Sequence, residues 1–191
     1  MLLPLFSMTF DKLLKARRSI RKYKNKKPDW RDIIECIDSM RYAPMAGGIF
    51  TLKFILISDP EKIAKITEYT QQPFVGTAQY LVVVCSNPNR TINAYGERGG
   101  IYVRQQAGAA MQNFLLKLTE KKLASCWIGL FIEPMIKEIL KIPSDVQVEA
   151  IFPIGLAAER PYTREKIEID NILYFDEYNK KQMKYIKKIN C

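Results

Sequence analysis

IYVRQQAGAAMQNFLLKLTEKKL, residues 101–123, is the longest helical pattern in the chain. Its apolar side chains nearly surround the helix instead of lining one face; they are Ala107, Ala109, Ala110, Met111, Phe114, Leu115 and Leu118. A helix that is apolar on most sides lies either in the centre of a core or in an interface between subunits. The segment therefore predicts a central helix around which the rest of the chain is organised.

Three apolar stretches outside this helix are typical of strands. Residues 80–86, YLVVVCS, are apolar in both alternating positions, as expected for a central strand that is covered on both faces. Residues 146–155 and the β-branched and aromatic run at 50–58 predict two further strands. Strands and helices do not alternate strictly along the chain, so we expect an α+β fold.

Shorter helical patterns lie between these strands. We expect helices over residues 9–17, 29–43, from 59 to about 69 and over 133–142. The helix at 29–43 ends before Pro44, because the residue that precedes a proline disfavours the helical conformation. Its predicted apolar stripe consists of Trp30, Ile33, Ile34, Ile37 and Met40.

Length and composition favour one domain over residues 1–191. The chain is 48% hydrophobic, and no low-complexity or Ser/Gly/Pro-rich stretch suggests a linker. No apolar run is long enough to cross a bilayer, and MLLPLFSM lacks the features of a signal peptide. We therefore expect a cytoplasmic protein without a membrane partner.

The net charge of +10 is concentrated at two places. Residues 12–31 contain ten Lys and Arg residues against Asp29 alone, and residues 180–191 contain five Lys residues and no acid. We interpret the second cluster as part of a solvated basic tail that begins at about residue 176. The alternative is a nucleic-acid-binding protein, but the basic residues lack interleaved stacking aromatics beyond Tyr23 and Trp30, so we expect no nucleic-acid partner.

The residue types that are missing exclude several kinds of chemistry. The chain has no histidine, and its four cysteines have no CxxC spacing, so we expect no metal site. Without histidine, the usual Ser-His and Cys-His nucleophile pairs are also excluded. Cys85 and Cys126 lie in apolar surroundings that are typical of buried, reduced thiols. We expect no catalytic side chain and infer that a bound group supplies the chemistry.

The basic stretch RRSIRKY, residues 17–23, is the first candidate site. In an extended segment side chains alternate, which places Arg17, Ser19 and Arg21 on one face and Arg18 and Ile20 on the other. Two guanidinium groups beside a hydroxyl can bind a dianionic phosphate through charge-assisted hydrogen bonds. A solvated basic surface after a helix is the alternative.

Three further stretches could border a ligand. PMAGG, residues 44–48, exposes backbone without large side chains, although a glycine pair after a helix is also a common turn. SCWIGLF, residues 125–131, places Gly129 among apolar residues, and a buried turn that packs Trp127 into the core explains it equally well. RPYTREK, residues 160–166, is a second basic cluster that could share one phosphate with RRSIR.

Taken in order, these stretches resemble the nitroreductase-like FMN-dependent oxidoreductase family. RRSIRKY resembles its arginine-rich signature, and APMAGGIFTLKFILI, residues 43–57, resembles its Ala-Pro-Ser-Ala-Gly-Asn segment and following strand. YGERGGIYVRQQAGAAMQNFLLKL, residues 95–118, is similar to its long central helix. SCWIGLF and IFPIGLAAERP, followed by Arg164 and Lys166, complete the resemblance over essentially the whole chain.

The resemblance implies a fold, a partner and a reaction. The fold is a mixed central sheet flanked by helices, with the long central helix at a homodimer interface and two FMN sites built from both chains. The reaction takes hydride from NADH or NADPH and passes it, by a ping-pong mechanism, to a small acceptor such as a nitro compound or a quinone. An FMN-binding protein without turnover is the alternative.

The resemblance also implies which residues bind FMN. Arg17, Ser19 and Arg21 correspond to side chains that hold the phosphate and the pyrimidine side of the ring, and Arg18 contributes backbone. Arg21 is the candidate cation that raises the reduction potential. The other implied contacts are the C-terminal basic pair Arg164 and Lys166, the backbone of Ile128 and Gly129 beside the reactive edge, and a loop that reaches the partner subunit's flavin, formed by Pro44, Met45, Ala46, Gly47 and Gly48.

Five positions depart from the family pattern. Met45 replaces Ser, Gly48 replaces Asn, Phe50 replaces Gln, Gln106 replaces Asp and Lys122 replaces Gly. Where polar side chains that would bind the flavin are missing, backbone groups or water must provide the hydrogen bonds.

Overall fold

The computed structural model describes residues 8–161 and 163–183. Its contacts divide the chain into two compact units, Met1–Pro161 and Tyr162–Cys191, which are described separately below. That the whole chain is one domain stays a prediction.

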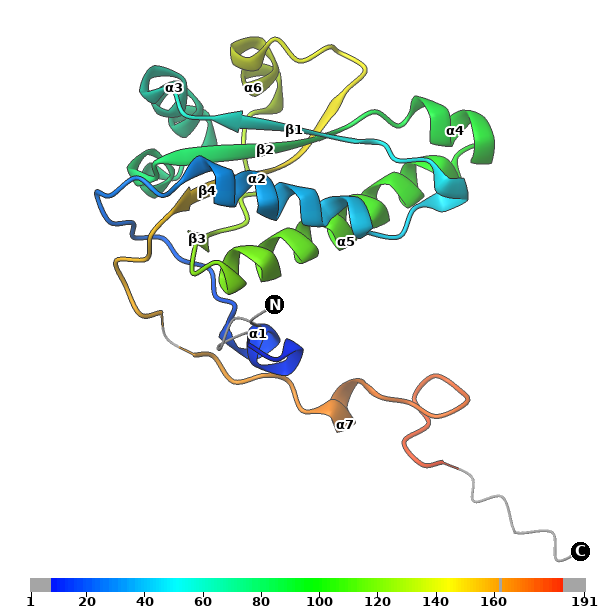
Figure 1. Cartoon of the computed structure of the whole chain (residues 1–191). Helices are drawn as coiled ribbons and strands as arrows, with labels where there is room; N and C mark the ends of the chain where they lie inside the picture. The colour runs from blue at the N-terminus through cyan, green and yellow to red at the C-terminus, as the bar shows by residue number, and fades with distance from the viewer. Residues whose placement is uncertain (1–7, 162, 184–191) are drawn as a thin grey trace, which may run out of the picture. The chain divides into compact units, whose positions relative to one another are not determined.

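An antiparallel sheet forms the centre of the first unit (Figure 1). Its order is β1-β2-β4-β3, with β1 at Leu52–Ile57, β2 at Tyr80–Ser86, β4 at Gln147–Gly155 and the two-residue β3 at Ala124–Ser125. Each of the three pairings is antiparallel. The prediction of a mixed sheet is therefore wrong for the described residues: helices connect the paired strands, but each connection brings the chain back antiparallel.

The sheet is covered by helices on both faces, which makes three layers. On one face, β2 residues Tyr80, Val82 and Val84 pack in one cluster with side chains of α2, Trp30–Asp38, and α5, Arg98–Glu120. On the other face, the alternate β2 residues pack with α3, Pro60–Thr70, and α6, Glu133–Leu140. All seven β2 residues are buried, which confirms the predicted central strand.

The helix α5 is central within its own chain. Its contacts include α2, the 3-10 turn Ser39–Tyr42, α4 at Asn89–Tyr95 and α1 at Phe10–Ala16. Phe114 packs edge-to-face on Phe152 of β4, with 5.4 Å between the ring centroids. Many of the apolar side chains around α5 therefore pack against other elements of the same chain. The dimer interface stays a prediction.

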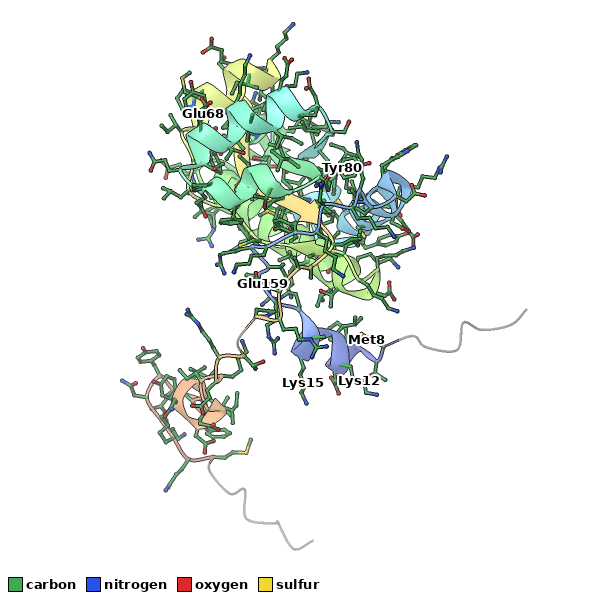
Figure 2. The ribbon with its side chains drawn as sticks, turned by 90° about the vertical axis from the view of Figure 1, so that its left-hand side faces the viewer. Met8, Lys12, Lys15, Glu68, Tyr80 and Glu159 are labelled. Atoms are coloured by element: carbon green, nitrogen blue, oxygen red, sulfur yellow. The ribbon has the colours of Figure 1, made fainter. Side chains whose placement is uncertain are left out.

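Some of the expected apolar faces are exposed. The helix α2 ends at Asp38, earlier than predicted, and a 3-10 turn continues the chain. Ile33 in α2 and Met40 in the turn are buried, but Trp30 and Ile34 are each 47% exposed. In α1, Phe10 is 65% exposed, and Lys12 and Lys15 project from the helix (Figure 2). The Thr9 N-cap makes no side-chain capping hydrogen bond.

Two further 3-10 turns, Ala46–Gly48 and Pro73–Thr77, connect the elements of the first unit.

The second unit contains the short helix α7 at Ile169–Ile172 and a turn in which the backbone N–H of Phe175 donates to the carbonyl of Lys180. Residues 184–191 of the predicted basic tail and residues 1–7 of the stretch MLLPLFSM lie outside the described residues. No described helix is long and apolar enough to cross a membrane.

Candidate functional site

The basic stretch RRSIRKY leaves α1 at Arg17 and continues as an extended segment, as predicted. It runs beside β3 and the end of β4: the N–H of Ile20 donates to the carbonyl of Ser125 at 2.9 Å, and that of Lys24 donates to Leu156 at 2.8 Å. In return, the N–H of Ala158 donates to the carbonyl of Lys22 at 2.9 Å. Backbone hydrogen bonds therefore fix the segment on the sheet.

The two faces of this segment have different surroundings. Ile20 is 7% exposed and packs in a small cluster with Tyr23 and Ala124. Cys126 is buried, and Arg21, Ser19 and Arg17 each lower the pKa of its thiol. Burial raises the pKa of Cys126 and outweighs these three lowering effects. All three residues of the predicted grouping therefore act on the same thiol, and their role in binding an anion stays a prediction.

Glu159 fixes this part of the segment and was not among the predicted residues. Its Oε1 accepts hydrogen bonds from the backbone N–H groups of Arg21 at 2.6 Å and Lys22 at 3.2 Å. No ion pair joins Glu159 to Arg17 or Arg21 within the described ranges. The carboxylate therefore binds backbone and leaves both guanidinium groups available for an anion.

Two aromatic residues also shape the segment. Arg21 lies over the ring of Phe74, with 5.9 Å from its Cζ to the ring centroid. Tyr23 is buried against Gly155, whose missing Cβ would lie 2.9 Å from Cδ1 of Tyr23. The hydroxyl of Tyr23 donates to the carbonyl of Ile20 at 2.7 Å, and burial raises its pKa.

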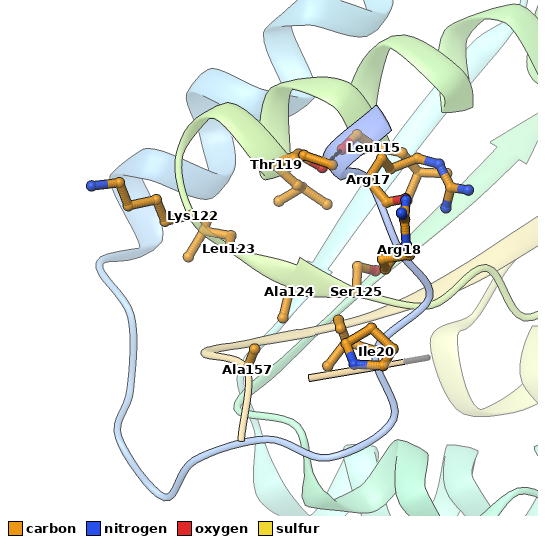
Figure 3. A pocket seen from close by; sticks show the side chains of 13 residues that line it. Arg17, Arg18, Ile20, Leu115, Thr119, Lys122, Leu123, Ala124, Ser125 and Ala157 are labelled. Carbon is orange, nitrogen blue, oxygen red and sulfur yellow. Dashed lines mark hydrogen bonds between the residues drawn. The ribbon is translucent and has the colours of Figure 1, made fainter. Parts of the chain in front are cut away.

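Behind the segment is a cavity of about 210 Å³ (Figure 3). Arg18 and Ile20 line it together with Leu115, Leu118 and Ser125. Arg18 itself donates to the carbonyls of Lys15 at 2.5 Å and Arg17 at 2.8 Å. These bonds cap the C-terminal end of α1, so the Arg18 side chain has a structural role here.

The glycine loop Pro44–Gly48 lies between α2 and β1. Gly47 and Gly48 both have positive φ angles, 56° and 70°, which favours glycine at each position. A Cβ on Gly47 would lie 2.3 Å from the hydroxyl of Tyr95 in α4, whereas a Cβ on Gly48 would meet nothing within 4 Å. Both glycines are exposed, so their backbone is accessible.

The Ile128–Gly129 stretch follows β3. Ile128 is 1% exposed and exchanges backbone hydrogen bonds of 3.0 Å with Ile151, so its side chain belongs to the core. Gly129 is exposed, and a Cβ there would have only the indole nitrogen of Trp127 near it, at 4.0 Å. Trp127 is 40% exposed and packs partly on Phe152. Only the backbone at these positions can border a ligand.

Arg164 and Lys166 belong to the second unit. The structure does not define their distance from the Arg17–Arg21 segment, so their role stays a prediction. In the described part of the chain, no group of three or more Cys, Asp or Glu side chains is arranged to hold a metal ion.

Comparison with known proteins decides the family. The family model described as "Nitroreductase family" matches residues 14–72 and 68–156, which include every predicted site residue except Arg164 and Lys166. The chain belongs to the nitroreductase family. This membership confirms the resemblance that the sequence motifs indicated and the α+β fold class.

Relatives and solved structures agree with this assignment. An Archaeoglobus fulgidus protein assigned as an NADH dehydrogenase/NAD(P)H nitroreductase is 28% identical over 149 residues, 75% of this chain and 83% of its own. A nitroreductase family protein from Clostridium novyi NT has 26% identity and a TM-score of 0.73, covering 91% of this chain and 96% of that one. An FMN-dependent nitroreductase from Clostridium difficile has 25% identity and a TM-score of 0.75, covering 87% and 98%.

Proposed function

We propose that this nitroreductase-family chain is an FMN-dependent oxidoreductase that takes hydride from NADH or NADPH and reduces a small acceptor. The observation that carries the proposal is the extended segment of residues 17–23, which backbone hydrogen bonds fix on the sheet and on which Arg17, Ser19 and Arg21 occupy alternate positions. Such a set of two guanidinium groups and a hydroxyl fits a phosphate. The names of the relatives support FMN and NAD(P)H in particular.

In this proposal, the residues of the chain bind and orient the FMN. Arg17, Ser19 and Arg21 bind the FMN phosphate, while Glu159 keeps their backbone in place through its two N–H acceptor bonds. Arg21, which lies over the ring of Phe74, would also contact the pyrimidine side of the flavin ring. That Arg164 and Lys166 also reach this phosphate stays a prediction from the family resemblance. Gly129 offers exposed backbone and no side chain, which would leave room for the reactive edge of the flavin.

FMN, when bound, supplies the hydride transfer from the nicotinamide to the acceptor. The donor leaves before the acceptor binds, which makes the cycle ping-pong. The acceptor is a small planar compound such as a nitro compound or a quinone. No protein nucleophile is required, in keeping with a chain that has no histidine.

We further propose a homodimer in which the flavin sites are shared. The cavity of about 210 Å³ is lined by Arg17 and Arg18 but not by Ser19 or Arg21, and it is smaller than the roughly 300–1,000 Å³ usual for ligand pockets. The larger cavities, of about 580 and 560 Å³, are lined by other residues. A second copy that brings Pro44–Gly48 to the Arg17–Arg21 segment would complete the site. A cytoplasmic location stays a prediction.

Two anaerobic half-reactions test the proposed function. The protein is reconstituted with FMN, and NADH or NADPH is added without oxygen; we expect the flavin band near about 450 nm to bleach. The remaining nucleotide is then removed. A nitroaromatic or a quinone added after this step should restore the flavin band. FMN that binds but never bleaches with either nucleotide would indicate a flavin-binding protein without turnover. A protein that does not bind FMN would contradict the whole proposal.

A further inference from the structure

Gln106 is a buried amide in the middle of α5, and only 3% of it is exposed. Its Oε1 accepts hydrogen bonds from the N–H of Thr51 at 3.1 Å and from the Thr51 hydroxyl at 2.6 Å. Its Nε2 donates to the carbonyl of Ile49 at 3.3 Å. One side chain thus joins the central helix to the junction between the glycine loop and β1.

This arrangement requires a group that accepts and donates at once. An amide has an acceptor oxygen with two lone pairs and a donor nitrogen, whereas an ionised carboxylate only accepts. The Asp that is frequent here in the family could not donate to the Ile49 carbonyl when ionised. Because Thr51 is itself only 6% exposed, losing Gln106 would leave buried backbone groups without a partner.

The hydrogen bonds of Gln106 fix the loop as well as the strand. The N–H of Ile49 donates to the carbonyl of Ala46 at 3.0 Å and closes the turn Ala46–Gly48. Gln106 holds the other end of the same residue through the Ile49 carbonyl. On the far side of the loop, Tyr95 of α4 lies against Gly47. The loop is therefore held between α4 and α5.

We propose that Gln106 is a positioning residue for the flavin site: it sets the place of the Pro44–Gly48 loop, and through this loop it acts on the flavin bound by the partner subunit. The inference rests on the proposed function, which brings that loop to the FMN. The inference gives a role to Gln106, which replaces the family's Asp. Because Met45 and Gly48 offer no polar side chain, the backbone of the loop must bind the flavin instead. A backbone that binds through its own N–H and C=O groups has to be held accurately.

Gln106→Met tests the proposal, because methionine has a similar length and volume but forms none of the three hydrogen bonds. We expect about tenfold weaker FMN binding, the factor that corresponds to roughly one lost net hydrogen bond. We also expect an altered visible circular dichroism of the bound flavin, which reports only the flavin's surroundings. Thr67→Val in α3 is the control, because it removes a hydrogen bond to the Ile63 carbonyl at a different place and should change neither readout.

A milder variant covers the case in which Gln106→Met does not fold. Thr51→Val removes only the 2.6 Å hydroxyl bond and keeps the bonds from the Thr51 N–H and to the Ile49 carbonyl. Two- to threefold weaker FMN binding with altered dichroism is expected. Wild-type affinity and dichroism in the folded Gln106 variant, or in Thr51→Val if that variant alone folds, would overturn the inference. Failure of the wild-type protein to bind FMN would instead be a failure of the proposed function.

A mixed dimer tests the action across the interface. One chain carries Gln106→Met and the other carries Arg17→Ala with Arg21→Ala, and the two are purified through different tags. If the loop acts on the partner's flavin, one site receives intact arginines and an intact loop, and it binds FMN with wild-type affinity and dichroism. The other site carries both defects. A mixed dimer without any wild-type site would overturn the inference.

Discussion

Two neighbouring glycines in the loop have different reasons for being glycine. Gly47 and Gly48 share a positive φ, but only Gly47 has a side chain above it, that of Tyr95. We expect Gly48→Ala to cost about 1–2 kcal/mol from backbone strain alone. Gly47→Ala adds a collision with the tyrosine hydroxyl, so it should destabilise the protein more and weaken FMN binding further.

Urea unfolding and FMN titration of both variants check this difference. Replacing Tyr95 by Ala in the Gly47→Ala background should recover most of the additional loss, because the collision partner is gone. Equal effects of the two single substitutions would show that the contact with Tyr95 does not matter.

The buried cysteines make the free energy of unfolding depend on pH in the alkaline range. Burial raises the pKa of Cys36 to about 12 and that of Cys85 to about 11. Because the folded state favours the neutral thiols, their stabilisation is complete below about pH 8.5, where the unfolded thiols titrate, and is lost as the pH rises. The free energy of unfolding should therefore fall by about 1.4 kcal/mol per pH unit for each thiol above that value.

Urea unfolding between pH 8 and 10.5 measures this slope. Tyrosines and lysines also titrate in this range, so the wild type is compared with Cys36→Ala/Cys85→Ala, whose slope should be less steep. Identical slopes would contradict the assignment to these thiols.

At the level of single residues, the sequence could predict which side chains share a face but not what holds them. Alternation placed Arg17, Ser19 and Arg21 together because an extended segment has a period of two. Glu159 and Phe74 could not be found in this way, since their contacts with Arg21 join positions far apart in the chain. The three bonds of Gln106 to Ile49 and Thr51 depend on tertiary packing in the same way.

At the level of elements, the strongest patterns predicted the structure best. The strand β2 has the predicted bounds, and α5 begins three residues earlier than the pattern indicated, because the glycines Gly99 and Gly100 weaken the helical signal there. The two-residue β3 and the short α4 were not predicted. Two residues are too few to show a period, and β3 exists only because it pairs with β4.

The pairing of the basic segment with β4 gives an element-level prediction. Gly155→Ala should place a methyl group 2.9 Å from Cδ1 of Tyr23 and push the segment away from the sheet. We expect a loss of about 1–3 kcal/mol in the free energy of unfolding and weaker FMN binding, since Arg21 is two residues from Tyr23. Gly100→Ala, where nothing lies within 4 Å of the added Cβ, is the control and should not destabilise the protein. Wild-type stability and FMN affinity in Gly155→Ala would argue against this packing.

At the level of the whole molecule, the exposed apolar residues indicate where a second copy would bind. Trp30 and Ile34 of α2 are each 47% exposed, on the same face of the sheet that α5 covers (Figure 1). Isolated apolar residues on a surface are common, but two on one helix next to a central helix favour an interface in this layer.

Ile34→Lys should therefore weaken the homodimer at least about tenfold, because it places a charge where the dimer would bury an apolar contact. Analytical ultracentrifugation of the variant beside Glu138→Lys measures the effect. Glu138 lies on α6, on the opposite face of the sheet, so this control introduces the same side chain away from the expected interface. A wild-type protein that sediments as a monomer would contradict the proposed dimer.

The binding of FMN in comparison with riboflavin tests the central claim most directly, because the two ligands differ only in the phosphate. We expect the wild type to bind FMN at least about a hundredfold more tightly, and Arg17→Ala/Arg21→Ala to lose this preference. Lys22→Ala, which removes an exposed cation one residue beyond Arg21, should keep it. An FMN preference that survives the double substitution, or that Lys22→Ala removes equally, would show that the face formed by Arg17, Ser19 and Arg21 is not the phosphate site.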